Sequence, residues 1–318
     1  MTNASSPQPP TPHESAPVSL PDQQSVPESL DQLLDEAQNF HEASLAVSRY
    51  VHQWVLRNGP SARELADVLH GKWLGHPLHP LLTDLTVGAW TWGFYFDLMA
   101  RLTGSRQTQH LADRLIWLGT LSALPTAIAG LADFSAIKRS AASYGGAHAL
   151  LNSVAWLCFL ESSRARLAKN QSRAFFLALG GMLVSSLSAW LGGDLVYRHR
   201  IGVNHAPAAN LTDWTVALPL DDLSEATLTP VEVGGESLVL FRHGQKVVAI
   251  SGVCSHAGGP LGDGQRIDEW CVECPWHQSV FDLRDGHVVH GPAVYAQPHY
   301  LTRIRDGQIE VRAAGPGA

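Results

Sequence analysis

Cysteine and basic residues are both scarce in this chain, and each scarcity excludes a class of protein. Only 4 of the 318 residues are cysteine, too few for the disulfide framework of a small secreted domain. Lysine and arginine total 22 against 29 acidic residues, which gives a formal net charge of -7. Nucleic-acid-binding domains ordinarily present a basic face, so we expect no nucleic-acid partner. The N-terminus has no basic segment followed by an apolar run, and we expect no cleaved secretion signal.

Aliphatic residues are nearly absent from the first 27 positions, which are rich in proline, serine and glutamine. A segment of this composition cannot bury enough apolar surface to fold, so residues 1–27 are predicted to be a disordered tail. Apolar residues then recur at helical spacing, and this pattern predicts an amphipathic helical segment over 28–70, made of one helix or two.

Charged residues are missing altogether from 115–132 and 175–193, each long enough to cross about 30 Å of hydrocarbon as a helix. Two further apolar stretches, 81–100 and 141–160, are less clean because they include Asp84, Asp97 and His148. A soluble helical bundle is the alternative, but lysine and arginine are confined to the connections between the four stretches. We therefore expect a four-helix transmembrane bundle over 71–205 embedded in a lipid bilayer, with Asp97 and Glu161 at solvated helix ends.

Short alternating segments follow the last apolar stretch, and they predict a compact all-β domain over 212–314. The clearest is "ESLVLFRHGQKVVAI" (236–250), in which "HG" marks a hairpin turn. The predicted fold class is therefore multidomain, a transmembrane helical bundle plus a C-terminal all-β domain. An even number of membrane crossings places the N-terminal region and the β domain on the same side of the membrane.

Two cysteine and histidine pairs lie close together in this β domain. Cys254-x-His256 is followed after residues 257–273 by Cys274-x-x-His277. A Cys2His2 zinc site uses the same ligands, but it usually takes two cysteines from one segment and two histidines from the next. Here each segment supplies one residue of each kind.

This constellation resembles the ligand loops of the Rieske iron-sulfur family. The segments "CSHAGGPL" (254–261), "CPWHQSVFD" (274–282) and "GPA" (291–293) stand where that family has two ligand loops and a proline loop. The resemblance implies a Rieske [2Fe-2S] cluster whose inner iron is bound by two cysteines and whose outer iron is bound by two histidines. The implied metal ligands are Cys254, Cys274, His256 and His277. Three groups of surrounding residues are implied as well. Gly258, Gly259 and Pro260 let the first loop turn with its N–H groups towards the sulfurs, and Ser279 is a hydrogen-bonding group. Gly291 and Pro292 cover one side of the cluster.

Departures from the family pattern narrow the resemblance further. Rieske proteins that oxidise quinols have a disulfide where this chain has Gly258 and Trp276, and a tyrosine where it has Phe281. The chain is thus more similar to a Rieske-type ferredoxin, and the missing hydroxyl implies a reduction potential in the lower part of the Rieske range. Cys271 falls outside the ligand pattern and is predicted to be a core thiol. An oxygenase would need a mononuclear iron domain, for which the rest of the chain leaves no room.

The membrane half resembles an uncharacterised family of four-helix bacterial membrane domains. The similarity is carried by "GKWLGHPLHPLLTDL" (71–85) and "GGDLVYRHRIGVNH" (192–205). Alternating helix direction places several histidines on the membrane face that also bears the β domain: His79, His148, His199 and His205. Ionisable groups at this depth often mark cofactor sites, so quinone and haem b are candidate cofactors here. The alternative is that these side chains only cap helix ends or shape turns.

We therefore predict a membrane-anchored Rieske protein that carries single electrons to or from a redox protein, with no complete catalytic site of its own. One alternative is a quinol-oxidising or haem-linked redox module that uses the membrane domain near His148. A second alternative is a redox sensor. The predicted location is a bacterial inner membrane with the Rieske domain in the cytoplasm, because iron-sulfur clusters are normally inserted there. Basic residues are nearly balanced between the two faces and do not decide the orientation.

Overall fold

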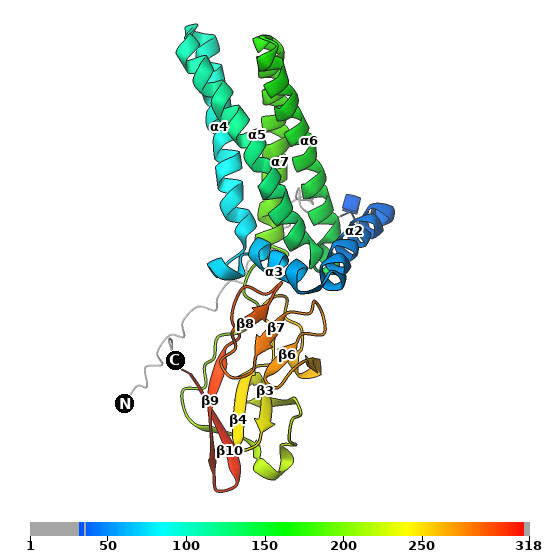
Figure 1. The fold of residues 1–318 in the computed structure, drawn as a ribbon, viewed down its shortest axis with the longest axis vertical. Helices are drawn as coiled ribbons and strands as arrows, with labels where there is room; N and C mark the ends of the chain where they lie inside the picture. The colour runs from blue at the N-terminus through cyan, green and yellow to red at the C-terminus, as the bar shows by residue number, and fades with distance from the viewer. Residues whose placement is uncertain (1–31, 35, 315–318) are drawn as a thin grey trace, which may run out of the picture.

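A bundle of long helices forms one end of the molecule and a β domain forms the other. The computed structural model describes residues 32–34 and 36–314. The tail predicted over 1–27 lies outside these described residues. Figure 1 shows the helical bundle above, the β domain below, and two shorter helices crossing between them. The crossing helices are α2 (Gln38–Arg57) and α3 (Gly59–His70), and both lie within the predicted helical segment 28–70. The bundle comprises α4 (Leu78–Thr103), α5 (Arg106–Ser135), α6 (Ala142–Leu167) and α7 (Gln171–Tyr197).

The four bundle helices are joined as two antiparallel hairpins by very short connections. Gly104 ends α4 in the left-handed conformation with φ 70°, and Ser105 then caps α5 by accepting a hydrogen bond from the Thr108 N–H. In the second hairpin, Asn170 caps α7 by accepting from the Arg173 N–H. Such local stop and start signals reverse the chain within a few residues.

Each bundle helix overlaps one predicted apolar stretch and is longer than it. By length and composition, two of the described helices, α5 and α7, are apolar enough to cross a membrane. Only 33% of the apolar window in each of these two helices is buried inside the protein. The helices α4 and α6 are less apolar and are not among these candidates.

The prediction for Asp97 was wrong, because its side chain is fully buried rather than solvated. Arg166 on α6 donates to Asp97 on α4 at 2.5 Å and to Asp113 on α5 at 2.7 Å. Gln109 donates a further hydrogen bond to Asp97 at 2.9 Å. The charge thus pairs across three helices, and its partner lies 69 residues away in the sequence.

The β domain contains two antiparallel sheets. The larger has the strand order β1-β10-β9-β4-β3-β2 and the smaller has the order β5-β6-β7-β8. The larger sheet is built from β1 (Thr215–Pro219), β2 (Thr229–Val233), β3 (Glu236–His243), β4 (Lys246–Ser251), β9 (His299–Arg305) and β10 (Gln308–Ala313). The smaller is built from β5 (Gln265–Arg266), β6 (Cys271–Glu273), β7 (Val280–Asp282) and β8 (Val288–His290).

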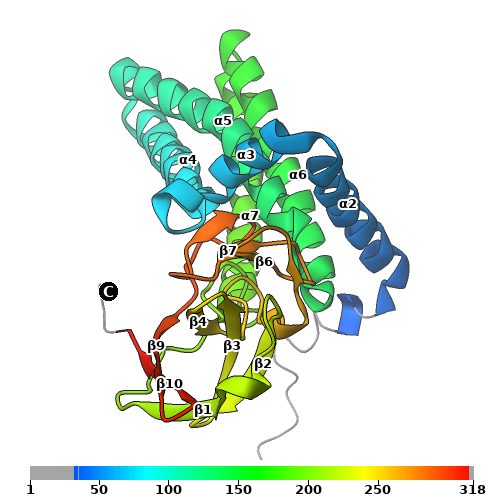
Figure 2. The same cartoon turned by 60° about the horizontal axis from the view of Figure 1, so that its bottom comes forward.

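The core of the β domain joins the two sheets through fully buried side chains. Phe241 and Ile250 from the larger sheet pack in one cluster with Phe281 from the smaller sheet. The same cluster includes Cys254 and Cys274, which places both thiols at the edge of the core. Figures 1 and 2 agree that the smaller sheet faces α2 and α3, while β10 reaches the far end of the molecule.

Candidate metal centre at the domain boundary

Two loops place the two predicted cysteines, one after β4 and one between β6 and β7, and both loops are built around the same kind of turn. In the first loop, the Cys254 carbonyl accepts from the Gly258 N–H at 2.8 Å and the Cys254 N–H donates to the Gly259 carbonyl at 2.8 Å. In the second loop, Cys274 makes the equivalent pair of bonds with Gln278 and Ser279. The two cysteines are 1% and 2% exposed, so each loop presents a buried sulfur from a rigid turn.

Two glycines make this close approach of the loops feasible. Gly258 has φ +83°, a conformation that other residues adopt only with strain. A Cβ at Gly259 would lie 2.9 Å from the Cys274 Sγ, too close for any side chain. The neighbouring Pro260 is exposed and leads the chain away from the sulfurs.

The two sulfurs face each other and are surrounded by backbone N–H donors. A hydrogen bond from the Cys254 thiol, together with the N–H groups of Trp276 and His277, lowers the pKa of Cys274 to about 7. The same bond, followed by burial, raises the pKa of Cys254. The N–H groups of His256 and Ala257 point to the Cys254 sulfur in turn. Thiolate ligands of a metal need such donors, and they come from the residues that directly follow each cysteine.

The two predicted histidines lie beside the sulfurs with a ring-centre distance of 5.0 Å and an interplanar angle of 85°. In both His256 and His277 the Nδ1 atom is buried and has no hydrogen-bond partner among the described residues. Burial, followed by the charges of His52 and Lys138, lowers the pKa of His277 to about 4. Burial also holds the pKa of His256 well below its ordinary value. Both rings are therefore neutral at pH 7 with an unused buried nitrogen, which is the form that binds a metal.

Cys254, Cys274, His256 and His277 thus converge as two thiols and two imidazoles with unsatisfied ligand atoms. A [2Fe-2S] cluster of the Rieske type uses this donor set, two thiolates on one iron and two imidazoles on the other. These four residues would hold such a cluster, and the cluster would supply one-electron chemistry. The donor set fits the cofactor.

A third loop closes the site from one side. The Ser279 hydroxyl accepts a hydrogen bond from the Ala293 N–H at 3.0 Å, which ties the second cysteine loop to the loop containing Gly291 and Pro292. Phe281 is fully buried in the core beneath, and it offers no hydroxyl to the site. Ser279 therefore holds the third loop in place.

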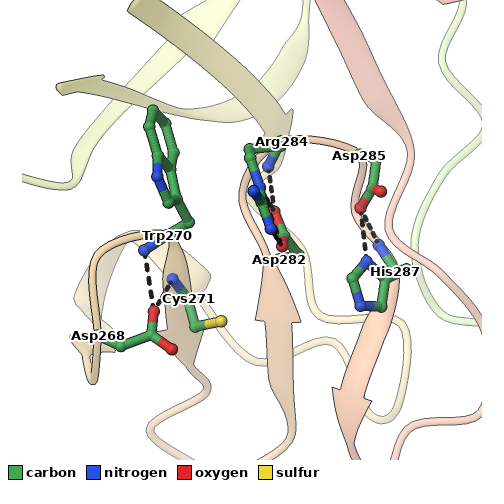
Figure 3. Close-up of polar contacts among 7 residues, drawn as sticks. All are labelled: Asp268, Trp270, Cys271, Asp282, Arg284, Asp285 and His287. Atoms are coloured by element: carbon green, nitrogen blue, oxygen red, sulfur yellow. Dashed lines mark hydrogen bonds and ion pairs between the residues drawn. The ribbon is translucent and has the colours of Figure 1, made fainter. Parts of the chain in front are cut away.

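Cys271 lies apart from the other two thiols of the domain, in a separate polar network shown in Figure 3. Asp268 accepts hydrogen bonds from the backbone N–H groups of Trp270 and Cys271, at 2.9 and 2.8 Å. Burial, followed by its contact with Asp268, raises the pKa of Cys271 to about 12. This thiol is held in the Asp268 network, outside the core cluster that contains Cys254 and Cys274.

Figure 3 also shows three side chains that could be mistaken for a second metal site in the described part of the chain. Asp282, Asp285 and His287 have potential ligand atoms within 4.8 Å of one another. Arg284, however, pairs with Asp282 at 2.5 Å, and Asp285 already contacts His287 at 2.8 Å. The cluster is therefore satisfied by its own ion pairs.

Helices α2 and α3 cover the histidine side of the site, a feature that the sequence analysis missed. His52 Nε2 lies 2.6 Å from Gln278 Oε1, and Asp67 accepts from the Gly291 N–H at 2.8 Å and lies 3.0 Å from His290 Nδ1. A cavity of about 20 Å³ remains beside His277. Its lining includes His70 of α3 and Ser135 of α5. Asp67 and His70 are three positions apart on one helical face, and this spacing was the only feature of the sequence that pointed to an interface on α3.

The four candidate histidines of the membrane half do not form one site. The rings of His79 and His148 lie together, with a centre-to-centre distance of 6.4 Å. His199 lies instead 3.7 Å from the Asp194 carboxylate, and its ring packs on Tyr144. His205 belongs to the connection after α7, and its backbone N–H donates to the Ser255 carbonyl in the first cysteine loop.

Comparisons with known proteins divide the chain in the same place as the structure. The Rieske [2Fe-2S] domain profile matches residues 213–301, and the profile of a predicted membrane protein domain, DUF2231, matches residues 75–205. The anthranilate 1,2-dioxygenase ferredoxin subunit of Burkholderia cepacia is 33% identical over 103 residues, which are 32% of this chain and 94% of that protein. The cytochrome b6-f complex iron-sulfur subunit of Chlorobaculum tepidum is 26% identical over 96 residues, which are 30% of this chain and 51% of that protein.

Among solved structures, the ferredoxin of carbazole 1,9a-dioxygenase from Nocardioides aromaticivorans is 32% identical. It covers 32% of this chain and 100% of its own, with a TM-score of 0.31. The four converging side chains and the profile matches lead to one conclusion: the chain belongs to the Rieske [2Fe-2S] family, and its Rieske domain is fused to a DUF2231 predicted membrane domain.

Proposed function

We propose that this chain is a membrane-anchored electron-transfer protein whose Rieske cluster is held by Cys254, Cys274, His256 and His277. The observation that carries the proposal is the pair of buried Nδ1 atoms without partners, set beside two hydrogen-bonded thiols. A buried imidazole nitrogen without a partner is costly, and an outer iron would satisfy both. The chain transfers single electrons as a component of a larger redox system.

The test is low-temperature EPR of the full-length protein purified in detergent, before and after dithionite. We expect a rhombic Rieske signal in the reduced sample, and its loss in Cys254→Ser and His277→Ala. Cys271→Ser is the matched control, since its thiol lies in the same domain but outside the site, and it should keep the signal. An unchanged signal in His277→Ala would contradict the ligand assignment.

Membrane anchoring by all four bundle helices is supported by their outer surfaces. Large apolar side chains are exposed on α4 and α6 as well, including Leu85 at 50%, Trp92 at 58%, Leu150 at 57% and Leu157 at 52%. Contiguous apolar exposure on this scale is unfavourable in water, and a bilayer would cover it. Two of the charged residues on α4 and α6, Asp97 and Arg166, face inward and pair with each other.

The proposed orientation places the Rieske domain in the cytoplasm of a bacterium, with the bundle in the inner membrane. A C-terminal reporter fusion that is active only outside the cell tests this side of the proposal. Activity of that reporter would reverse the orientation and leave the electron-transfer role untouched.

The route of the electron is proposed to pass through the helical domain. His256 and His277 would bind the outer iron, and helices α2 and α3 cover their side of the domain. The alternative of a quinol-oxidising module places its site near His148 in the membrane domain, since the cavity of about 20 Å³ beside His277 has room for a single water. A soluble partner would reach these histidines only after the two domains separate.

A further inference from the structure

The two hairpins of the membrane bundle repeat one local arrangement around a histidine. On the first helix of each, the sequence reads His79-Pro-Leu-Leu-Thr in α4 and His148-Ala-Leu-Leu-Asn in α6. On the second helix it reads Thr126-Ala-Ile-Ala-Gly in α5 and Ser188-Ala-Trp-Leu-Gly in α7. Each hairpin therefore pairs a histidine with a small hydroxyl residue, followed four positions later by a glycine.

The contacts within the two hairpins repeat as well. His79 Nδ1 lies 2.9 Å from the Thr126 carbonyl oxygen, and His148 Nδ1 lies 2.9 Å from the Ser188 carbonyl oxygen. A carbonyl only accepts, so Nδ1 carries the proton in both rings and Nε2 keeps its lone pair. In His148 this Nε2 accepts from the Asn152 amide nitrogen at 3.0 Å, and a metal bound at Nε2 would replace that hydrogen bond. An Nδ1–H held by a carbonyl is how proteins orient a histidine that binds a metal through Nε2.

The glycines let each ring lie against the backbone of the neighbouring helix. A Cβ at Gly130 would be 2.8 Å from the Cε1 of His79, and a Cβ at Gly192 would be 3.0 Å from the Cε1 of His148. Neither position has room for a side chain unless the ring moves. The backbone of the neighbouring helix at Gly130 or Gly192 thus holds each ring in place, in addition to the hydrogen bond at Nδ1.

The two rings lie at a separation that suits one metal ion between them. Their centres are 6.4 Å apart and their planes are perpendicular, at 86°. A metal–nitrogen bond of about 2.0–2.1 Å, extended by roughly 1.2 Å to the ring centre, puts two trans imidazoles about 6.4 Å apart. Because His79 and His148 belong to different hairpins, such a metal would bridge the two halves of the bundle.

The missing third ligand identifies the kind of metal centre. In the part of the chain that the structure describes, the one group of three candidate ligands is in the β domain, at Asp282, Asp285 and His287. Two imidazoles alone complete the coordination of a metal whose other four positions are filled by a macrocycle, as in haem. A bare zinc or copper ion would need more protein ligands than this site offers.

We propose that His79 and His148 are the two axial ligands of a haem in the membrane bundle. The inference rests on the proposed function, because it gives the Rieske cluster an internal partner. Ser135 lines the cavity next to His277, and Gly130 lies five residues earlier on α5, about 7.5 Å along the helix axis. One electron leaves one centre and reduces the other, with no bond broken and no proton required.

The experiment measures both centres in the same sample of full-length protein, expressed in haem-sufficient cells and purified in detergent. Pyridine haemochrome absorbance gives haem per chain, and EPR of the reduced sample gives the cluster. We expect about one haem per chain. His79→Ala and His148→Ala should each lower the haem content at least tenfold and keep the cluster signal, which reports that the chain has folded.

Three variants separate this proposal from its alternatives. His76→Ala is the matched control, because this exposed histidine three positions earlier should keep both centres. His148→Met retains an axial ligand and should keep haem with shifted absorption bands. Cys254→Ser should lose the cluster and keep the haem, so a failed cluster proposal is distinguishable from a failed haem proposal. A full-length protein that neither contains haem nor binds added haemin, or haem that persists in both alanine variants, would overturn the assignment.

Discussion

Asp67 joins the two domains, and replacing it tests whether the helical domain truly holds the Rieske domain in place. Its side chain is 7% exposed and belongs to α3. It accepts from the Gly291 N–H, contacts His290, and pairs with Lys72 at 3.0 Å. Asp67→Ala would leave the Gly291 N–H without its acceptor at the interface.

The size of the effect follows from these contacts. A hydrogen bond to a charged group contributes about 1.5–3 kcal/mol, and Asp67 makes two of them across the interface. Part of that gain is offset, because the buried carboxylate no longer has to lose its water. We therefore expect Asp67→Ala to weaken docking by about 3 kcal/mol, on the order of a 100-fold change in the docking equilibrium. Asp67→Asn keeps an acceptor oxygen and should weaken docking by about 1 kcal/mol.

Hydrogen exchange is the appropriate assay because it reports rare opening of an interface. The amide of Gly291 should exchange on the order of 100 times faster in Asp67→Ala than in the unmodified protein. Asp221→Ala, an exposed substitution in the Rieske domain, should leave this rate unchanged. Exchange at Gly291 that is equally slow in Asp67→Ala would refute the idea that this carboxylate holds the domains together.

Three further predictions concern single sites. Cys271→Ser should leave iron content and the EPR signal unchanged, since this residue lies in the Asp268 network and outside the core cluster that holds Cys254 and Cys274. Loss of iron would reassign it as a ligand. Asp97→Asn should lower stability by about 1.5–3 kcal/mol, because Arg166 loses one of its two carboxylate partners and keeps Asp113. Thermal unfolding in detergent measures this, and an unchanged midpoint would mean that the Asp97 charge contributes nothing. Iron-free protein should lose stability as pH falls from about 6.5 towards 4. In the unfolded chain His256 and His277 bind protons over this range, whereas their lowered pKa values keep them neutral in the folded state. Urea unfolding at pH 7.5 and 5 checks this, and equal midpoints would contradict it.

The candidate cluster site was accessible from the sequence because its chemistry is local. Cys254 and His256 are two positions apart, and Cys274 and His277 are three apart, so short loops determine which side chains converge. The bundle helices were accessible for a similar reason, since apolar stretches and short connections predict them without any knowledge of packing. That the four helices cross a membrane remains a prediction, for which α5 and α7 qualify by length and composition.

Long-range contacts left no comparable pattern in the amino-acid sequence. Asp97 was misjudged because its partner Arg166 lies 69 residues away, and a charge near a helix end is ordinarily solvated. Asp67 was overlooked because Gly291 lies 224 residues away, and nothing in α3 distinguishes an interface carboxylate from an exposed one. The repeated histidine arrangement was visible in the sequence only in part, because the pairing of His79 with His148 depends on how two hairpins pack.

The placement of α2 and α3 between the bundle and the β domain has a kinetic consequence. A soluble ferredoxin must diffuse to its partner, so its rate depends on concentration and on the salt that screens the encounter. In the proposed arrangement both redox centres belong to one polypeptide, and electron exchange between them would be a first-order process. Such a rate would be indifferent to dilution, and it would fall only when the interface itself opens.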